Sequence, residues 1–139
     1  MAIKWRFCDY ETHGKVIPIQ IWETGAPAGA QAHFATTVRH LSVTETWTLE
    51  DGAKLLTGPH APLTELLIDF NEWAPRAAKG TKRRFRPVGF RDEDERAFIL
   101  FGGCEKVGGV LSPLETFNDA LRLWGEWKRG MGKVHGRDL

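Results

Sequence analysis

The first residues of the chain alternate large apolar side chains with polar ones. Residues 3–10 follow the two-residue period of a half-buried strand. The run 16–22 then predicts a short helix that ends at Gly25, and the run 27–43 predicts a longer helix. The apolar face of the longer helix has members at i, i+4 and i+7, namely Phe34, Val38 and Leu41. The N-terminal part therefore predicts a strand followed by a helical hairpin.

The middle of the chain predicts strands. Residues 49–59 carry Gly and Pro at turn positions and predict a connector. Three strand patterns follow, at residues 63–70, 83–90 and 97–102, and the last is continuously apolar, as in a buried central strand. The acidic cluster 92–95 lies between the second and third patterns. It predicts a solvated hairpin tip.

The C-terminal part predicts a helix. Ser112-Pro113-Leu114-Glu115 has a capping serine, a proline at the first helical position and a glutamate that closes a capping box. An apolar stripe follows, made of Leu114, Phe117, Leu121 and Trp124 and extended by Ala120, Leu123 and Trp127. Gly130 and Gly132 end it. We expect one domain over residues 1–130 and a basic, mobile tail over residues 131–139.

The predicted fold class is therefore α+β. We expect a small antiparallel sheet with an N-terminal helical hairpin and a C-terminal helix, in the order β-α-α-β-β-β-α. The 139 residues, 42% of them hydrophobic, suffice for the core of one domain. No run of about 18 apolar residues predicts a membrane span. Cys8 and Cys104 share no CxxC spacing, so we expect reduced core thiols in a cytoplasmic protein.

The net charge of +1 conceals an uneven distribution of charge. Residues 79–91 contain no acidic residue, but they contain the cations Lys79, Lys82, Arg83, Arg84, Arg86 and Arg91. The C-terminal part adds Lys128, Arg129, Lys133 and Arg137. Residues 42–72, in contrast, contain six acidic residues, and Lys54 is their single lysine or arginine. One side of the molecule should attract polyanions such as RNA, and another should repel them.

Several short segments of the sequence occur in an order that can be compared with known families. Residues 9–19 lead from a strand end through Gly14 to an apolar helix, and residues 54–58 precede Leu63-Thr64-Glu65-Leu66. The pair Phe85-Arg86 opens a short apolar strand. Residues 98–101 and Gly103-Cys104-Glu105-Lys106 then precede residues 112–115. Together these phrases resemble the RelE/ParE toxin superfamily, nearest its HigB-like and phage-derived branches, over almost the whole chain.

The resemblance implies a function but leaves alternatives open. It implies a type II toxin of a toxin-antitoxin system, neutralised by a helix-turn-helix antitoxin with which it can form an oligomer. The leading hypothesis is a ribosome-dependent mRNA endoribonuclease that needs neither metal nor cofactor. The alternative is a non-catalytic binding protein, either a gyrase-inhibiting toxin of the ParE type or a phage-derived nucleic-acid-binding module.

Cleavage of RNA by its own 2′-hydroxyl requires a base, an acid and cations beside the phosphate. Arg86 matches the superfamily's arginine after an aromatic residue and is the candidate phosphate clamp; its alternative role is an exposed arginine on a polar strand face. Lys106 is a second catalytic candidate, or else a turn lysine. His135 and His60 are candidates because histidine as a residue type suits proton transfer near neutral pH, although no motif match places either of them in a site. The predicted catalytic set is Arg86, Lys106 and His135.

The remaining cations predict a surface that binds RNA. The candidates are Lys82, Arg83, Arg84, Arg91, Lys128, Arg129 and Lys133, and their alternative role is a solvated charged face. Two departures from the superfamily put catalysis in question: Leu67 stands where many nucleases have a basic residue, and residues 71–81 are longer than the usual hairpin. His33 and His40 lack the spacing of metal ligands, so no metal site is predicted.

Overall fold

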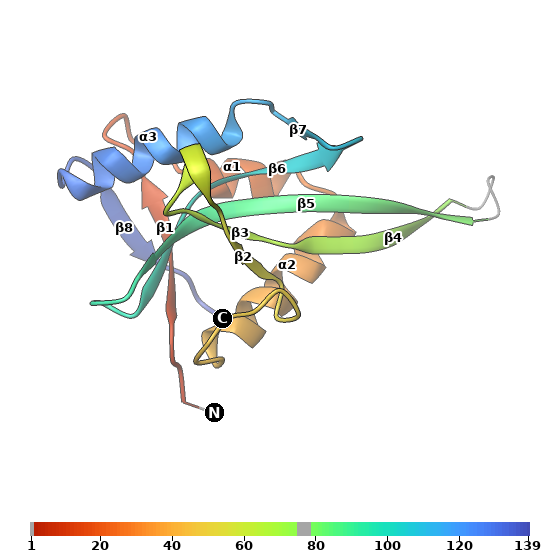
Figure 1. Ribbon diagram of the computed structural model, residues 1–139, viewed down its shortest axis with the longest axis horizontal. Coiled ribbons are helices and arrows are strands. Elements are labelled where there is room, and N and C mark those ends of the chain that lie inside the picture. The colour runs from red at the N-terminus through yellow and green to blue at the C-terminus, as the bar shows by residue number, and fades with distance from the viewer. Residues whose placement is uncertain (1, 75–78) are drawn as a thin grey trace.

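The computed structural model describes residues 2–74 and 79–139 (Figure 1). Its fold is α+β, as predicted, and the described residues form three α-helices and a mixed, mostly antiparallel open sheet of eight strands. The N-terminal prediction is confirmed by β1 (Arg6–Glu11), α1 (Pro18–Gly25) and α2 (Ala28–Ser42). Within the described residues, no helix is long and apolar enough to cross a membrane.

The middle of the chain holds more strands than its pattern predicts. The expected connector contains β2 (Ala53–Leu55) and a 3₁₀ turn (Gly58–His60). The strand expected at residues 63–70 is divided at Leu67 into β3 (Thr64–Leu66) and β4 (Ile68–Ala74). The other two expected strands lie within β5 (Lys79–Asp92) and β6 (Ala97–Val107). Residues 93–96 form the turn between them, and Glu93, Asp94 and Glu95 are exposed, as predicted for this acidic tip.

The C-terminal helix begins later than the capping motif predicts. Ser112 ends β7 (Val110–Ser112), and α3 (Thr116–Lys128) follows Glu115 without a side-chain cap. Leu114, expected in the apolar stripe, is 65% exposed, whereas Phe117, Ala120 and Leu123 are buried. The prediction of this start is therefore wrong, because pairing of Ser112 with Glu105 of β6 removes the serine from the cap position.

The last residues are a paired strand, not the mobile tail that the sequence predicts. The final strand, β8 (Lys133–Gly136), pairs with β1, and the backbone N–H of Arg137 donates to the Phe7 carbonyl. The Arg137 side chain binds Asp9 and Glu23 at 2.9 Å each and lies 5.0 Å from the centre of the Phe34 ring. We call Asp9, Glu23 and Arg137 the C-terminal clasp. Net charge along the segment predicts solvation, but the long-range partners of Arg137 anchor it.

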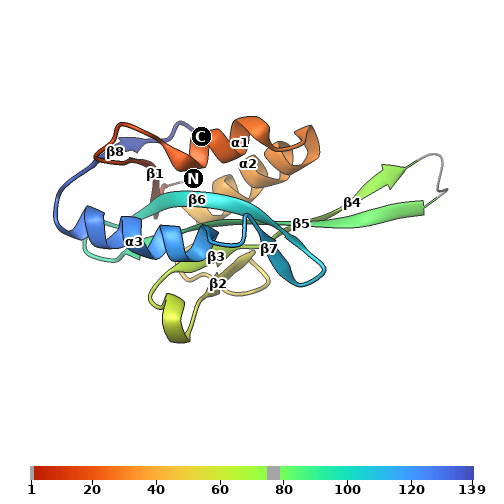
Figure 2. The same cartoon turned by 90° about the horizontal axis from the view of Figure 1, so that it is seen from above.

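The sheet has the strand order β2-β3-β5-β6-β1-β8, with β4 paired to β5 and β7 to β6. It is larger than predicted and is mixed, since β1 runs parallel to β6. Helices α1 and α2 cover one face and α3 covers part of the other, as Figure 2 shows. The first core contains Trp5, Phe34 and Phe98, and the second contains Tyr10, Phe101 and Phe117. Cys8 and Cys104 are buried free thiols of the second core, as predicted.

An irregularity in the pairing of β5 with β6 determines which side chains share a face. Val88 pairs with Gly102 but Gly89 pairs with Leu100, so β6 contains one extra residue at this point. Before this bulge, Ile99 and Phe101 face α3; after it, Cys104 does. Side chains alternate between faces along a strand. Lys106 therefore lies on the α3 face, and Glu105 lies on the opposite one.

Candidate functional site

Arg86 is a buried arginine at the centre of a charged group on the α3 face of the sheet. The residue is 6% exposed. Its Nη1 lies 2.6 Å from Asp69 Oδ1 and donates to the Phe85 carbonyl at 2.9 Å. Its Nε lies 4.0 Å from Glu65 Oε2 and has no hydrogen-bond partner among the described residues. Arg86 is therefore a buried arginine next to two carboxylates, and not the exposed strand-face arginine of the alternative prediction.

Glu65 is the functional candidate that the sequence predictions omitted. It comes from β3, pairs with Val88 of β5 and is 6% exposed. Burial raises the pKa of its carboxyl, and the positive charges of Arg86, Lys54 and Lys106 oppose that rise. The only signal in the sequence is its place in the Leu63-Thr64-Glu65-Leu66 phrase. That phrase does not indicate burial, because three of its neighbours in space are distant along the chain.

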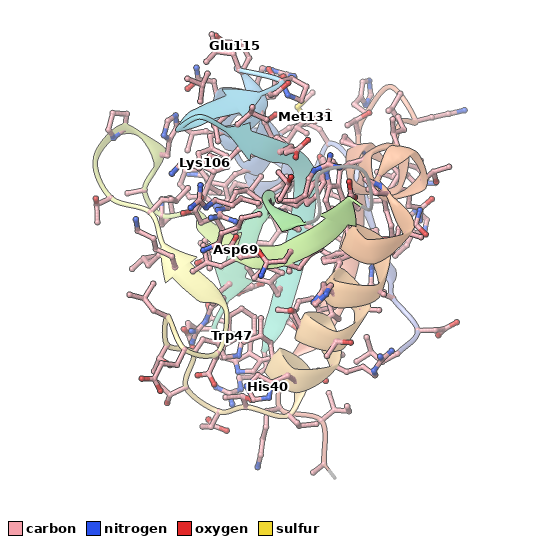
Figure 3. The ribbon with its side chains drawn as sticks, turned by 90° about the vertical axis from the view of Figure 1, so that its right-hand side faces the viewer. His40, Trp47, Asp69, Lys106, Glu115 and Met131 are labelled. Carbon is pink, nitrogen blue, oxygen red and sulfur yellow. The ribbon has the colours of Figure 1, made fainter. Side chains whose placement is uncertain are left out.

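Lys106 and Lys54 approach Glu65 from two other strands. The bulge in β6 turns Lys106 to the face that Arg86 occupies, while Lys54 of β2 pairs directly with Glu65. Figure 3 shows Asp69 and Lys106 on the same side of the molecule, away from α2. We define Lys54, Glu65, Asp69, Arg86 and Lys106 as the sheet-face cluster. The structure therefore brings together two of the three predicted catalytic residues.

The third, His135, lies elsewhere. It belongs to β8, at the edge of the sheet, and its Nε2 is 2.9 Å from Glu11 Oε1. Strands β1 and β6 separate β8 from β5. His60 is also engaged, with its Nε2 2.7 Å from Asn118 Oδ1. Neither histidine is part of the sheet-face cluster.

The predicted RNA-binding residues divide among several surfaces. Lys82 and Arg84 are exposed on β5, and alternation places them on the face of Arg86. Arg83 points to the other face, where it binds Glu105 at 2.6 Å and Glu72 at 3.2 Å. Only the first two cations extend the surface of the sheet-face cluster.

The other predicted RNA-binding cations have contacts outside the sheet-face cluster. Arg91 binds Glu93 at 2.9 Å and lies 4.4 Å from the centre of the Trp5 ring. Lys128 stands 3.6 Å from the centre of the Trp124 ring, and Arg129 Nε donates to the Met131 sulfur at 3.4 Å. Lys133 is exposed on β8, at the sheet edge. Lys128, Arg129 and Lys133 thus belong to the end of α3 and to β8, and not to the strands that carry the sheet-face cluster.

The chemistry of the cluster follows from one unsatisfied donor and one desolvated carboxyl. A buried donor without an acceptor costs about 1–3 kcal/mol, so an incoming oxygen atom that accepts from Arg86 Nε recovers that energy. A phosphate oxygen forms a strong, charge-assisted bond with a guanidinium. A carboxylate of raised pKa is in turn a better proton acceptor. The cluster thus contains the residue types that bind a phosphate and accept a proton, but Arg86 Nε and Glu65 are buried, and a phosphate oxygen reaches them only after neighbouring side chains move.

Comparison of the chain with known proteins identifies no relative. No family model, no curated protein and no solved structure matches the chain. The functional argument accordingly depends on the cluster itself.

Proposed function

We propose that the protein is an RNA-cleaving toxin of the RelE/ParE type whose active site is the sheet-face cluster. The observation that carries this proposal is the buried Arg86, whose Nε has no acceptor in the described residues and lies beside the desolvated carboxyl of Glu65. The order of one strand, two helices, antiparallel strands and a helix supports the resemblance found in the sequence. A cytoplasmic location, a ribosome-bound mRNA substrate and a helix-turn-helix antitoxin belong to the same proposal.

In the proposed reaction, Glu65 accepts the proton of an RNA 2′-hydroxyl. The 2′-oxygen then attacks the adjacent phosphorus, and the bond from phosphorus to the 5′-oxygen breaks. Arg86 and Lys54 stabilise the charge that develops on the phosphate oxygens, and Lys106 donates a proton to the leaving 5′-oxygen. The products are a 2′,3′-cyclic phosphate and a 5′-hydroxyl, and exchange with water restores Glu65 and Lys106.

A second candidate function is nucleic-acid binding without cleavage. The exposed cations Lys82 and Arg84 favour it, because contacts between such residues and phosphates do not require the buried pair. A toxin that only occupies its target, or a silent phage-derived module, would use this surface alone. The two functions differ in their dependence on Glu65.

The test is cleavage of a labelled RNA by the purified chain, with and without ribosomes, in the presence of a chelator. We expect cyclic-phosphate and 5′-hydroxyl ends, and we expect Glu65→Gln to lower the rate by roughly 10²–10⁴-fold, the usual contribution of a general base. Glu50→Gln, at an exposed carboxyl outside the cluster, is the matched control and should cut at the rate of the unmodified chain. If the unmodified chain leaves the RNA intact both with and without ribosomes, cleavage is refuted and the binding function remains.

A further inference from the structure

Access to the sheet-face cluster depends on the groups that surround the Arg86 guanidinium. Its Nη1 donates to the Phe85 carbonyl at 2.9 Å and lies 2.6 Å from Asp69 Oδ1, and its Nε lies 4.0 Å from Glu65 Oε2. The Phe85 carbonyl belongs to the main chain of β5, and the Glu65 side chain is only 8% exposed. The Asp69 side chain, in contrast, is 33% exposed. Of these three groups, only Asp69 can move into solvent without disturbing the sheet.

The contact between Asp69 and Arg86 is of the kind that a phosphate makes. Carboxylate and phosphate oxygens both accept charge-assisted hydrogen bonds from a guanidinium. The Nη1 nitrogen has two hydrogens, and it donates to Asp69 and to the Phe85 carbonyl. A phosphate oxygen therefore cannot bind at Nη1 while Asp69 remains there, and the negative charge of Asp69 repels an approaching phosphate. Asp69 thus competes with the proposed substrate for the same donor.

A second cation is available to Asp69 on the neighbouring strand. Asp69 of β4 is the direct cross-strand partner of Arg84 of β5, and Arg86 is its diagonal neighbour. Side chains of direct partners share a face with their Cβ atoms about 4.5–5.5 Å apart, and diagonal neighbours remain within reach of long side chains. The structure records the ion pair of Asp69 with Arg86 and leaves Arg84 exposed to solvent. Asp69 can therefore exchange one arginine for the other without a change in the backbone.

We propose that Asp69 is a gate for the anion site: it binds Arg86 in the closed state and turns to Arg84 before an RNA phosphate can bind Arg86. The inference deepens the proposed function and rests on it, since the phosphate belongs to the same RNA. A site that is open in only a fraction of the molecules binds its ligand more weakly by that fraction. A closed-to-open ratio of about ten thus lowers the apparent affinity for the phosphate about tenfold.

The experiment measures how the full chain binds a single phosphodiester. The probe is a uridine dinucleotide methylated on both 2′-oxygens, so that it cannot be cut, and binding is followed by NMR at the Arg86 Nε–H signal. We expect Asp69→Asn, which keeps the shape of the side chain but removes its charge, to raise the affinity about tenfold. Glu72→Gln is the matched control, because Glu72 is a nearby carboxylate of β4 that pairs with Arg83 on the other face. It should bind the probe as the unmodified chain does.

Arg84→Gln tests the open state of the gate without changing the sheet-face cluster. Loss of the open-state ion pair should lower the affinity for the probe about two- to fivefold in the unmodified background, the worth of one exposed pair. The same substitution should have no effect in the Asp69→Asn background. An equal loss in both backgrounds would show that Arg84 contacts the phosphate itself and would overturn the inference. Equal affinities of D69N and E72Q, or an Arg86 Nε–H signal that the probe does not shift, would overturn it as well.

Failure of the gate and failure of the proposed function give different results. If D69N binds the probe as expected but the chain leaves RNA intact, the proposed function is refuted and the gate stands as a control on anion binding. If the chain cuts RNA but D69N and E72Q bind the probe equally, the gate alone is refuted.

Discussion

Two arginines of this protein, Arg86 with 7% and Arg137 with 14% of the side chain exposed, hold carboxylates, but they differ in the contacts of Nε. In the C-terminal clasp, Arg137 binds Asp9 through Nε and Glu23 through Nη2, both at 2.9 Å, and its guanidinium also lies over Phe34. In the sheet-face cluster, Arg86 makes one short ion pair, with Asp69, while its Nε stands 4.0 Å from Glu65. Arg137 thus bonds to a carboxylate through Nε, whereas the buried Nε of Arg86 has no hydrogen-bond partner among the described residues.

The pKa of Arg137 in the clasp and the pKa of Glu65 in the cluster are both raised, but for different reasons. Burial acts to lower the pKa of Arg137, but hydrogen bonds to Glu23 and Asp9 outweigh it and raise that pKa. At Glu65, burial raises the pKa, and the cations Arg86, Lys54 and Lys106 do not overcome it. Burial is therefore the dominant influence on the pKa of Glu65, and ion pairing outweighs burial in its effect on the pKa of Arg137.

The largest expected effect is loss of stability when the clasp is broken. Arg137→Ala leaves Asp9, which is 5% exposed, and Glu23 without their cation, and we expect the free energy of unfolding to fall by about 3–5 kcal/mol. Arg86→Ala should cost less, about 1–3 kcal/mol, because Glu65 can take up a proton and Asp69 is partly exposed. Urea denaturation of both variants measures the two losses. Equal losses would mean that the two arginines are equivalent structural ions.

A smaller effect is a pH dependence of stability that comes from Glu65. Its folded-state pKa lies above the ordinary value of 4.5, so its favourable contribution is complete below pH 4.5 and is lost as the pH rises through the folded-state pKa. The difference in unfolding free energy between the unmodified chain and Glu65→Gln should decrease over that window. Urea denaturation at a series of pH values measures it.

Asp51→Asn provides a control of opposite sign for this measurement. A hydrogen bond from His40 lowers the pKa of Asp51 below 3.8, so its contribution is present above that value and is lost as the pH falls through the folded-state pKa. A flat difference curve for Glu65→Gln alongside the expected one for Asp51→Asn would show that Glu65 is not desolvated.

The smallest effect separates Lys106, which the sequence predicts as catalytic, from Lys133, which it predicts to bind RNA. Lys106→Ala should weaken RNA binding several-fold and lower the salt slope by about 0.7–0.9, since the ammonium that serves the leaving 5′-oxygen also attracts the phosphate that carries it. Lys133→Ala, at the far edge of the sheet, should leave both quantities unchanged. Anisotropy titrations measure both variants. Equal responses would place the RNA on β8 as well as on the cluster.

Periodic segments of this chain were predictable from sequence, while short and non-local ones were not. The apolar spacing of Phe34, Val38 and Leu41 identifies α2 because those residues are neighbours along one helix. The strands β2, β7 and β8 contain only three or four residues each and depend on partners far along the chain. Ser112 has the pattern of a helix cap, but pairing with β6 places it in a strand instead.

The candidate site was predictable only in part, for similar reasons. Arg86 and Lys106 could be selected as cations from the sequence, but their meeting depends on the bulge in β6. The burial of Glu65 depends on β2 and β5, which no local pattern connects to β3. His135 was selected only because histidine can transfer protons, and that property does not predict that its strand pairs at the edge of the sheet.

The most direct test of the difference between the two arginines uses lysine at each position. Arg86→Lys and Arg137→Lys both keep the charge but remove the forked guanidinium and its Nε donor. With folding verified by circular dichroism, we expect kcat/KM for RNA cleavage to fall by roughly 10²–10³-fold in Arg86→Lys, the usual cost of losing one donor to a developing oxyanion. Arg137→Lys should keep the rate of the unmodified chain. An unchanged rate in Arg86→Lys, or equal losses in both variants, would contradict the assignment of Arg86 to the active site.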